Sequence, residues 1–478
     1  MSATSPGAPM PPDADLPPLP QPPRAVFVGP ASAPHPHGQP HLPGSKYYTL
    51  RYLLNALLAE GESVIMAPAL SDDTAVLVRA LRALGADARW EPDAVAEGRW
   101  NLRVVGVAGH PRTPPDGVLR VGNAGAVLRL LLGIGALLPD VRFETDHPDS
   151  LGRRPNADLL DALRSLGVMV AAREPGGLLP ITLYGGPPRS GAVSISGLSS
   201  SQYLSALLYL APLLPAGLSI SVTGGLRSQP LVRATLRALA AADIQIDAAA
   251  DLRRFRVPGG QRFQPRHYQT PGDSPSAAAL LAAALALRAP LRITGFAAQD
   301  DDVIALLAAC ETLGVPFANR PDADMPGAPL ILDAGVRPHV SSPATVRRID
   351  GDALIDSVPA LVALACFLPG ETRFENVATL RVKESDRIYD LCAELSHAGA
   401  DVTPHPDSIS VRGRPEGLAG GATVHAHDDH RLAQALAIAA ARCQRGLTIT
   451  GADAVAKSYP WFFDDLARLG ADVRAVAG

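Results

Sequence analysis

Lysine is rare in this chain and stands only where it could do chemistry. Of the 43 basic side chains, only Lys46, Lys383 and Lys457 are lysines. Lysine offers a compact charge, three rotatable donors and a pKa that can fall on burial, none of which arginine provides. Lys383 lies in the segment 380–388, Leu-Arg-Val-Lys-Glu-Ser-Asp-Arg-Ile, where five of nine residues are charged although the chain as a whole is 19% charged. A solvated helix face usually explains such a segment, but the retained lysine favours a chemical role.

Several polar or glycine-rich stretches stand directly before expected helices. A helix N-terminus presents free N–H groups and a positive dipole, which together favour a bound anion. Ordinary capping needs only one side chain and explains each stretch when it is taken alone. These stretches are Gly44-Ser-Lys46 with Arg51, Gly122-Asn-Ala-Gly-Ala-Val-Leu-Arg129, Leu151-Gly-Arg-Arg-Pro155, Gly197-Leu-Ser-Ser-Ser-Gln-Tyr-Leu204, Ser228, Gly272-Asp-Ser-Pro-Ser276 and His427-Asp-Asp-His-Arg431.

The bulk composition excludes several classes of protein. A length of 478 residues predicts two or more domains. The net charge of −4 gives no basic footprint, so we expect no nucleic-acid partner. No apolar segment is typical of a membrane span, and the first residues do not resemble a Sec signal. The four cysteines are widely spaced and predict reduced, buried thiols in a cytoplasmic protein: Cys310, Cys366, Cys392 and Cys443.

Alternating short strands and helices predict an α/β fold. We expect a strand at 63–67, a helix that Asp72 and Asp73 cap and Gly85 ends, and a leucine-rich helix from 52 to Gly61 behind a loop with Lys46 and Arg51. One helix ending, Leu-Gly followed by Val or Ala, recurs and indicates a repeated strand–helix unit. It occurs at 84–86, 166–168, 313–315 and 469–471. Residues 1–23 are Pro-rich, and we expect them to be disordered.

Six motifs in one order resemble a known family. They are Gly-Ser-Lys, Gly-Asn-Ala-Gly, Ser-Ser-Gln-Tyr-Leu, Arg-Val-Lys-Glu-Ser-Asp-Arg, Asp-His-Arg and Ala-Lys-Ser-Tyr-Pro, and they contain all three lysines. Together they resemble the enolpyruvyl transferases, and among these the 5-enolpyruvylshikimate-3-phosphate synthases. The resemblance runs from about residue 43 to about residue 470, and no single motif would be decisive.

The resemblance implies a fold and a reaction. The fold has two hinged lobes, each with three βαβαββ repeats around buried helices. The first lobe would contain residues 24–45 and 272–478, and the second would contain 46–271. The implied reaction transfers the enolpyruvyl group of phosphoenolpyruvate to the 5-hydroxyl of shikimate 3-phosphate and releases phosphate. It would need no metal or organic cofactor, and the enzyme would be a cytoplasmic monomer with no nucleic-acid or membrane partner.

The motif matches imply a role for individual residues. Glu384 is the candidate proton donor to C3 of phosphoenolpyruvate, and Asp356 is the candidate base, with Lys46 as its competitor. We expect several cations from both lobes to repel one another in the open state until the negative charge of the ligand removes this repulsion, so closure should be linked to substrate binding. The implied phosphoenolpyruvate residues are Lys46, Gly125, Arg154, Gln202, Arg387, Arg431 and Lys457. The implied shikimate 3-phosphate residues are Lys46, Tyr47, Arg51, Ser200, Ser201, Gln202, Ser228, Asp356, Thr379 and Lys383.

Departures from the family pattern lie mostly on the acceptor side. Tyr47 stands where Ser is usual, Leu231 where a ring-stacking Tyr is common, and Thr379 where Asn is common. Ala126 and Leu130 also depart from the pattern, as does Leu50. An enolpyruvyl transferase for another alcohol therefore stays an alternative. The UDP-sugar branch uses a cysteine that residues 46–270 lack. A non-catalytic binding protein is disfavoured because Lys46, Asp356, Glu384 and Lys457 are all retained.

Overall fold

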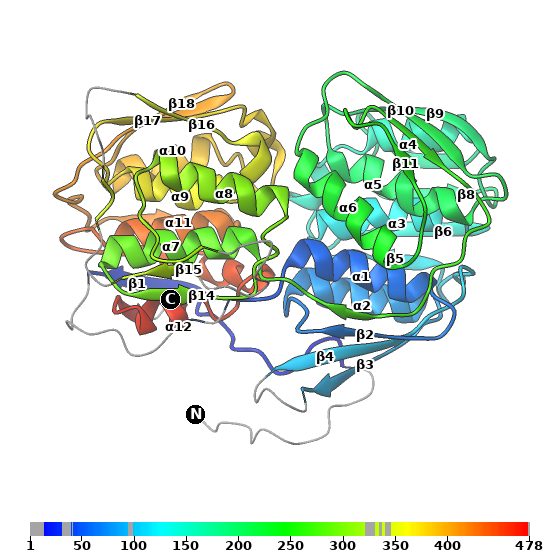
Figure 1. Cartoon of the computed structure of the whole chain (residues 1–478), viewed down its shortest axis with the longest axis horizontal. Coiled ribbons are helices and arrows are strands. Elements are labelled where there is room, and N and C mark those ends of the chain that lie inside the picture. Colours follow the sequence, from blue (N-terminus) through cyan, green and yellow to red (C-terminus); the bar gives the residue numbers. More distant parts are fainter. Residues whose placement is uncertain are drawn as a thin grey trace. The chain divides into compact units, whose positions relative to one another are not determined.

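The chain forms two units, each with its own hydrophobic core (Figure 1). A computed structural model describes residues 14–30, 40, 42–93, 99–320, 330–333, 337–339 and 346–476. Unit 1 contains Gly44–Thr270 and the residues before Leu19, and unit 2 contains Leu19–Pro43 and Pro271–Gly478. The sequence predicts boundaries after residues 45 and 271, and the structure has them after Pro43 and Thr270. No helix in the described part of the chain is both long and apolar enough to cross a membrane.

One βαβαββ repeat builds both units. Its first two strands are parallel, and its last strand pairs antiparallel to both the second and the third. In the middle repeat of unit 1 the sheet order is β5-β6-β8-β7, and the sheets β9-β10-β12-β11 and β16-β17-β19-β18 repeat this order. The elements of that middle repeat are β5 (Val118–Arg120), α3 (Gly125–Gly135), β6 (Asp140–Glu144), α4 (Ala157–Ser165), β7 (Met169–Arg173) and β8 (Leu178–Tyr184).

Two repeats are completed by a strand from a distant part of the chain. In unit 1, β13 (His267–Gln269) pairs parallel to β2 (Glu62–Met66). In unit 2, β1 (Ala25–Gly29) lies between β21 (Leu447–Thr450) and β22 (Asp472–Ala475) and is antiparallel to both. The pairing of β1 makes unit 2 discontinuous in sequence, whereas unit 1 is discontinuous because the residues before Leu19 join Gly44–Thr270. The sheets confirm the two-part α/β architecture.

The remaining strands follow the same repeat. Among the described residues, β14 and β15 form a two-stranded sheet. The bounds are β3 (Asp87–Pro92), β4 (Trp100–Val105), β9 (Gly191–Ser196), β10 (Leu218–Thr223), β11 (Asp247–Ala248), β12 (Arg254–Val257), β14 (Leu291–Ile293), β15 (Leu330–Leu332), β16 (Arg347–Asp350), β17 (Glu371–Glu375), β18 (Asp401–His405), β19 (Ser408–Arg412) and β20 (Thr423–His425).

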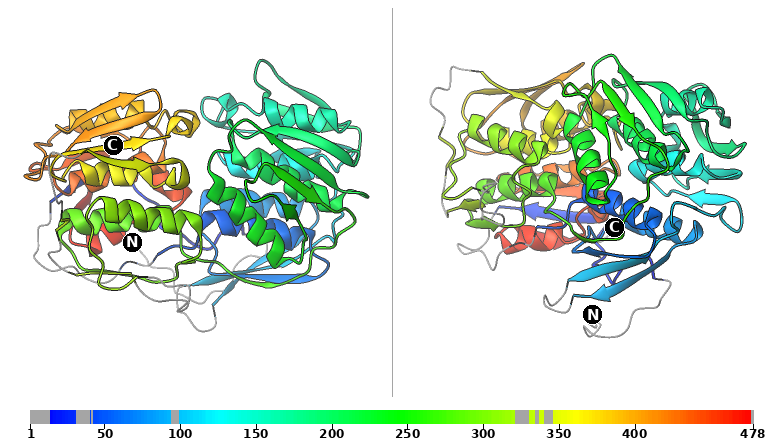
Figure 2. Two further views of the ribbon diagram at one scale, coloured as in Figure 1. Left: turned by 45° about the horizontal axis from the view of Figure 1, so that its top comes forward. Right: turned by 45° about the vertical axis from the view of Figure 1, so that its right-hand side comes forward.

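Within each unit the sheets lie outside and the first helix of each repeat lies inside (Figure 2). The inner helices are α1 (Lys46–Leu58), α3, α5 (Ser201–Leu210), α7 (Ser274–Leu287), α9 (Val358–Ala365) and α11 (His430–Ala440). The second helices are α2 (Asp72–Ala83), α4, α6 (Gln229–Ala241), α8 (Asp301–Thr312), α10 (Tyr389–His397) and α12 (Phe462–Arg468).

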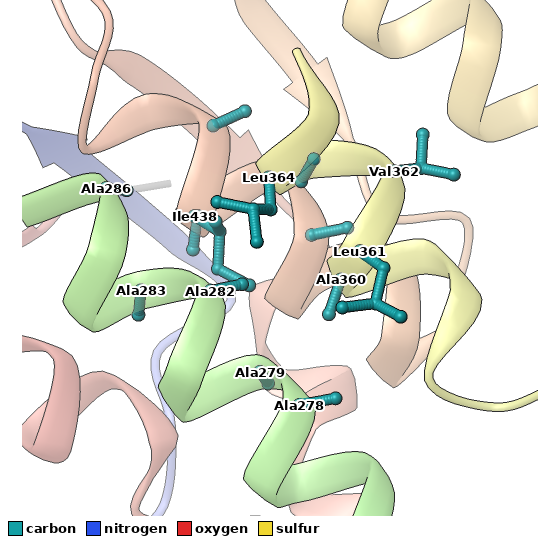
Figure 3. Packing of buried hydrophobic residues seen from close by; sticks show 14 of the residues in the cluster. Ala278, Ala279, Ala282, Ala283, Ala286, Ala360, Leu361, Val362, Leu364 and Ile438 are labelled. Carbon is teal, nitrogen blue, oxygen red and sulfur yellow. The ribbon is translucent and has the colours of Figure 1, made fainter. Parts of the chain in front are cut away.

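The inner helices of unit 2 are buried on every side and are apolar or small apart from His430, Arg431 and Gln434 of α11. All residues of α9 and α11 are buried, as is every residue of α7 except Leu287. The alanines of α7 share one cluster with Leu361, Leu364 and Ile438 (Figure 3). Small side chains let helices approach closely, and a helix buried all round shows no amphipathic period. The four cysteines are free and buried, as expected.

The recurring Leu-Gly ending confirms the expected repeat. It closes α2, α4, α8 and α12, each of which is the second helix of its repeat. Gly85 and Gly167 have φ values of 104° and 95°, a conformation that favours glycine. In three of the four cases the next residue leads directly into a strand, namely β3, β7 or β22.

Two helix starts differ from expectation. The helix expected from residue 52 begins at Lys46, so Lys46 and Arg51 lie within α1 and not in a loop before it. Tyr48, Thr49 and Leu50 are buried there, and this packing overrides the weaker helix propensity of Tyr48 and Thr49. Ser71 caps α2 by accepting a hydrogen bond from the N–H of Thr74, so Asp72 and Asp73 are not its caps.

The expectation of disorder for residues 1–23 does not hold at residues 14–18. Asp15 accepts hydrogen bonds from Arg79 at 2.8 Å and from Arg82 at 3.2 Å. The indole N–H of Trp90 donates to the Asp15 carbonyl at 3.0 Å, and Leu16 packs on the core of unit 1. Composition alone did not reveal these partners. Residues 1–13 lie outside the described part of the chain.

Deletion of residues 1–18 should lower the stability of unit 1. The deletion exposes the Trp90 indole and removes two partly exposed ion pairs. We therefore expect the free energy of unfolding to fall by about 1–2 kcal/mol. Denaturant unfolding measures this loss, and a deletion that stops at residue 13 is the control because it keeps Asp15 and Leu16. Equal midpoints for the two deletions would contradict a stabilising role for residues 14–18.

Candidate active site

The predicted site residues lie at or near helix starts in both units. In unit 1 they mark α1, α3, α5 and α6, with Arg154 directly after the short helix at Leu151–Arg153. In unit 2 they surround the starts of α9, α10 and α11 and end the short helices at Ala378–Val382 and Ala452–Lys457. The middle of an inner helix is buried in mostly apolar packing, and this favours polar side chains near its ends.

Arg387 is the centre of the unit 2 group. Its guanidinium is 1% exposed and contacts three carboxylates. It donates to Asp356 at 2.9 Å, to Glu384 at 2.6 Å and twice to Asp429, at 2.7 and 3.1 Å. Burial disfavours its charge, but Asp429, Glu384 and Asp356 outweigh this effect and hold the pKa of Arg387 above its ordinary value.

The two lysines of unit 2 extend this network. Lys383 lies 3.1 Å from Asp356, and Lys457 lies 3.2 Å from Glu384. Three cations therefore face three carboxylates once Arg387 and Asp429 are included. Within unit 2 this pairing offsets the repulsion among the three cations. The expected repulsion between cations of the two lobes stays a prediction.

Asp429 has two roles at once. It is fully buried and accepts two hydrogen bonds from Arg387, while its Oδ1 also accepts from the N–H of Arg431 at 2.8 Å as the cap of α11. Ser385 donates to its other oxygen at 3.1 Å. A capping carboxylate that also binds a guanidinium fixes the helix start and the cation together.

Arg431 and Thr379 complete the predicted residues of unit 2. Arg431 is 2% exposed, donates to Gln434 at 3.2 Å and lies 3.7 Å from Asp273. Asp273 also caps α7, as expected for it alone. The Thr379 hydroxyl is buried, and among the described residues it makes no hydrogen bond.

In unit 1, Lys46 is held by a carboxylate that the motifs did not indicate. Its Nζ lies 3.1 Å from Asp73 of α2, and the two side chains are 11% and 4% exposed. Arg51 is fixed further along α1. It donates to the Tyr47 carbonyl at 2.8 Å, to the Leu231 carbonyl at 2.9 Å and to the Thr235 hydroxyl at 2.8 Å. Tyr47 and Leu231, which depart from the family pattern, thus both support Arg51 through their backbone.

Gly125 and Arg154 adjoin each other at the start of α3. A Cβ built on Gly125 would lie 2.8 Å from Nη1 of Arg154, so a larger residue would have to displace this guanidinium. Gln202, at the start of α5, accepts from Arg129 at 2.8 Å. Arg129 also lies over the ring of Tyr203, 5.4 Å from its centroid. These contacts orient the side-chain amide of Gln202.

The serines before α5 and α6 differ in what they do. Ser200 caps α5 through the N–H of Gln202 at 3.3 Å, which is the ordinary capping role. Ser199 donates to Asp158, and Ser201 is buried in the first turn. Ser228 precedes α6 with φ 50° and is 8% exposed. A residue with a side chain is strained in this left-handed region, and such strain is concentrated at functional sites.

The motif reasoning missed three residues that hold the site: Asp73, Arg129 and Asp429. Arg129 and Asp429 lie within stretches that the sequence had already singled out, and a carboxylate directly before His430-Arg431 was a usable signal. Nothing in the sequence links Asp73 to Lys46, because this pair forms only when α1 packs on α2.

Replacement of Asp73 by Asn should destabilise unit 1 and displace the side chain of Lys46. Loss of one partner leaves the other charge of a buried ion pair uncompensated. We therefore expect the free energy of unfolding to fall by about 1–3 kcal/mol. Denaturant unfolding measures the loss, with Asp72→Asn as the matched control. If both variants unfold like the wild type, the Lys46–Asp73 pair does not stabilise α1 on α2.

Comparisons with known proteins agree with these motifs. The family model described as EPSP synthase (3-phosphoshikimate 1-carboxyvinyltransferase) matches residues 37–466. A 3-phosphoshikimate 1-carboxyvinyltransferase of Deinococcus radiodurans is 42% identical over 428 residues, which cover 89% of this chain and 92% of that protein. A protein of the same name from Methanococcoides burtonii is 33% identical over 446 residues, which cover 91% of this chain and 96% of that protein.

Solved structures share the fold. An EPSP synthase of Acinetobacter baumannii superposes with a TM-score of 0.75 at 23% identity, covering 94% of this chain and 99% of its own. The enolpyruvyl transferase NikO of Streptomyces tendae gives a TM-score of 0.69 at 20% identity, with coverage of 96% and 100%. At these identities the likeness concerns the fold, whereas the family-model match extends over most of the sequence. The chain therefore belongs to the EPSP synthase family.

Proposed function

We propose that this chain transfers the enolpyruvyl group of phosphoenolpyruvate to the 5-hydroxyl of shikimate 3-phosphate and releases phosphate. This is 3-phosphoshikimate 1-carboxyvinyltransferase activity, a step of the shikimate pathway. The observation that carries the proposal is the buried network of Arg387, Lys383 and Lys457 with its three carboxylates, which lies on the family's motifs. Phosphoenolpyruvate carries a phosphate and a carboxylate, and both suit arginine and lysine donors.

The proposal assigns the donor anion to residues of both units. Arg387, Arg431 and Lys457 come from unit 2, whereas Lys46, Gly125, Arg154 and Gln202 come from unit 1. In unit 2 the ligand's oxygens would compete with carboxylates for cations that are already desolvated and oriented. Preorganised donors lose little freedom on binding, and this favours electrostatic stabilisation of the reacting group.

The acceptor is assigned to a second set of residues. Ser200, Ser201 and Ser228 would bind the phosphate of shikimate 3-phosphate, with Gln202 and Lys383 contributing. Arg51 would hold its carboxylate, with Tyr47 beside it, and Thr379 would contact the acceptor ring. The buried Thr379 hydroxyl suits a ligand hydroxyl, because a buried polar group without a partner is costly.

Proton transfers at two positions accompany the group transfer. Glu384 would protonate C3 of phosphoenolpyruvate while the 5-hydroxyl oxygen attacks C2, and Asp356 or Lys46 would take the hydroxyl proton. In the tetrahedral intermediate, loss of a C3 proton and departure of phosphate restore the double bond. Lys46 and Lys457 would stabilise the leaving charge. Because Arg387 and Lys457 both contact Glu384, the ligand must draw these cations away before Glu384 can carry a proton.

The proposal also includes a cytoplasmic, monomeric enzyme. Four free, buried cysteines are compatible with a reducing compartment. The family activity supplies the substrates, and we propose no metal or organic cofactor for the transfer.

Phosphate release tests the proposed function directly. We expect the wild-type protein to release phosphate from phosphoenolpyruvate only when shikimate 3-phosphate is present, and Lys46→Ala to lose nearly all of this turnover. A coupled phosphate assay measures both rates. Tight phosphoenolpyruvate binding without phosphate release would refute shikimate 3-phosphate as the acceptor and favour a different alcohol.

The substitution Gly125→Ala should selectively weaken the binding of phosphoenolpyruvate. The added Cβ would lie 2.8 Å from Nη1 of Arg154 and displace this guanidinium. We expect the KM for phosphoenolpyruvate to rise by roughly tenfold, since a small misplacement of a binding group is costly, while the KM for shikimate 3-phosphate changes little.

Gly152→Ala is the matched control for this substitution. It adds a Cβ two residues before Arg154, where the nearest atom is 3.4 Å away. Steady-state kinetics with each substrate varied in turn separates the two constants. An unchanged phosphoenolpyruvate KM in Gly125→Ala would remove Arg154 from the donor site.

A further inference from the structure

The turn between β20 and α11 has an unfavourable backbone in front of a predicted substrate residue. His427 and Asp428 have φ values of 53° and 52°, so two consecutive residues with side chains adopt the left-handed conformation. Such a conformation persists only when its surroundings hold it in place. The next residue is Asp429, which binds Arg387 and caps the helix that begins with His430 and Arg431.

Glu394 supplies the contacts that hold this turn. One of its oxygens lies 2.9 Å from Nε2 of His427, and the other accepts from the N–H of His425 at 3.1 Å. The Glu394 side chain is 10% exposed. Burial acts to raise the pKa of Glu394, but the bonds from His427 and the His425 backbone outweigh it and leave this pKa below its ordinary value.

Glu394 and Arg387 contact the turn from one short stretch of chain. Glu394 lies within α10, and Arg387 lies two residues before this helix begins. Arg387 binds Asp429 at the end of the turn, while Glu394 binds His425 and His427 at its beginning. The segment 425–429 is therefore attached at two points to one continuous stretch of chain.

The other titratable groups around the pair of His427 and Glu394 lie farther away or are more exposed. His397 lies 3.6 Å from Glu394 but is 65% exposed, and the ring of His425 lies 4.9 Å from that of His427. Burial raises the pKa of Asp390, and the charge of His427 acts against this effect. No group of three or more His, Cys, Asp or Glu side chains among the described residues could hold a metal ion, so we treat these contacts as hydrogen bonds.

We propose that Glu394 and His427 are positioning residues for the donor substrate. They fix Asp429 where it aligns Arg387 and sets the start of α11, which carries Arg431. The inference rests on the proposed function, since Arg387 and Arg431 are assigned there to phosphoenolpyruvate. Neither Glu394 nor His427 contacts the ligand in this scheme, so their replacement acts through the two arginines.

Two substitutions of His427 separate its hydrogen bond from its backbone. Asn tolerates the left-handed conformation but is too short to reach Glu394. Gln places an N–H donor at the same number of bonds from Cα as Nε2 of histidine. We expect His427→Asn to raise the KM for phosphoenolpyruvate by roughly tenfold, with kcat and the KM for shikimate 3-phosphate within about twofold of wild type. His427→Gln should restore most of the loss, and His397→Gln is the matched control.

Hydrogen exchange of the peptide containing residues 426–431 gives a second readout that needs no turnover. This peptide should exchange faster in His427→Asn and at the wild-type rate in His427→Gln. If His427→Asn does not fold, Glu394→Gln replaces it. The NH2 group of glutamine cannot accept a hydrogen bond, so Glu394→Gln loses the contact to either His427 or the N–H of His425. The KM for phosphoenolpyruvate should again rise several-fold.

The outcomes distinguish this inference from the proposed function. An active wild type whose His427→Asn variant keeps its phosphoenolpyruvate KM would overturn the positioning role alone. So would an equal rise in both Michaelis constants, because that indicates a general loss of structure. If the wild type binds phosphoenolpyruvate but releases no phosphate, the proposed acceptor is wrong. Calorimetric binding of phosphoenolpyruvate, weakened in His427→Asn, would then still support positioning.

Discussion

The structure of unit 2 depends on one buried guanidinium. Arg387 is 1% exposed, and an ionised group removed from water is tolerated only when its charge and its donors are matched. Asp356, Glu384 and Asp429 provide this match from three separate segments: the residues before α9, the residues before α10 and the cap of α11. The starts of α9, α10 and α11 must therefore lie together for the core to close.

This constraint also prepares the binding of an anion. Lys383 and Lys457 are joined to the same carboxylates, so the cations are desolvated and oriented before any ligand is bound. In unit 1 the pair of Lys46 with Asp73 follows the same rule. Holding each cation against a fixed carboxylate avoids the mutual repulsion that a cluster of free cations would suffer.

The repeat explains why most of the predicted site residues lie at helix starts. Each repeat buries one helix nearly completely, and a polar side chain in the middle of such a helix needs a buried partner, as Arg51 has in Thr235. Helix ends are less demanding, and there the free N–H groups of the first turn also favour an anion. The same argument accounts for Ser200 at α5, Gly125 at α3 and Asp429 at α11.

The sequence by itself determined the features that depend on local chemistry. The Leu-Gly helix endings, the identity of the three lysines, the polar stretches before buried helices and the buried cysteines could all be predicted from neighbouring residues. Tertiary structure decided where α1 begins, how β1 joins β21 and β22, and how residues 14–18 pack. It also decided the partners of the cations: Asp73 for Lys46, Asp429 for Arg387 and Glu394 for His427. These pairs join residues that are distant in the chain, and the charge of each residue is visible in the sequence. Their distance depends on how whole helices pack, which no local pattern records.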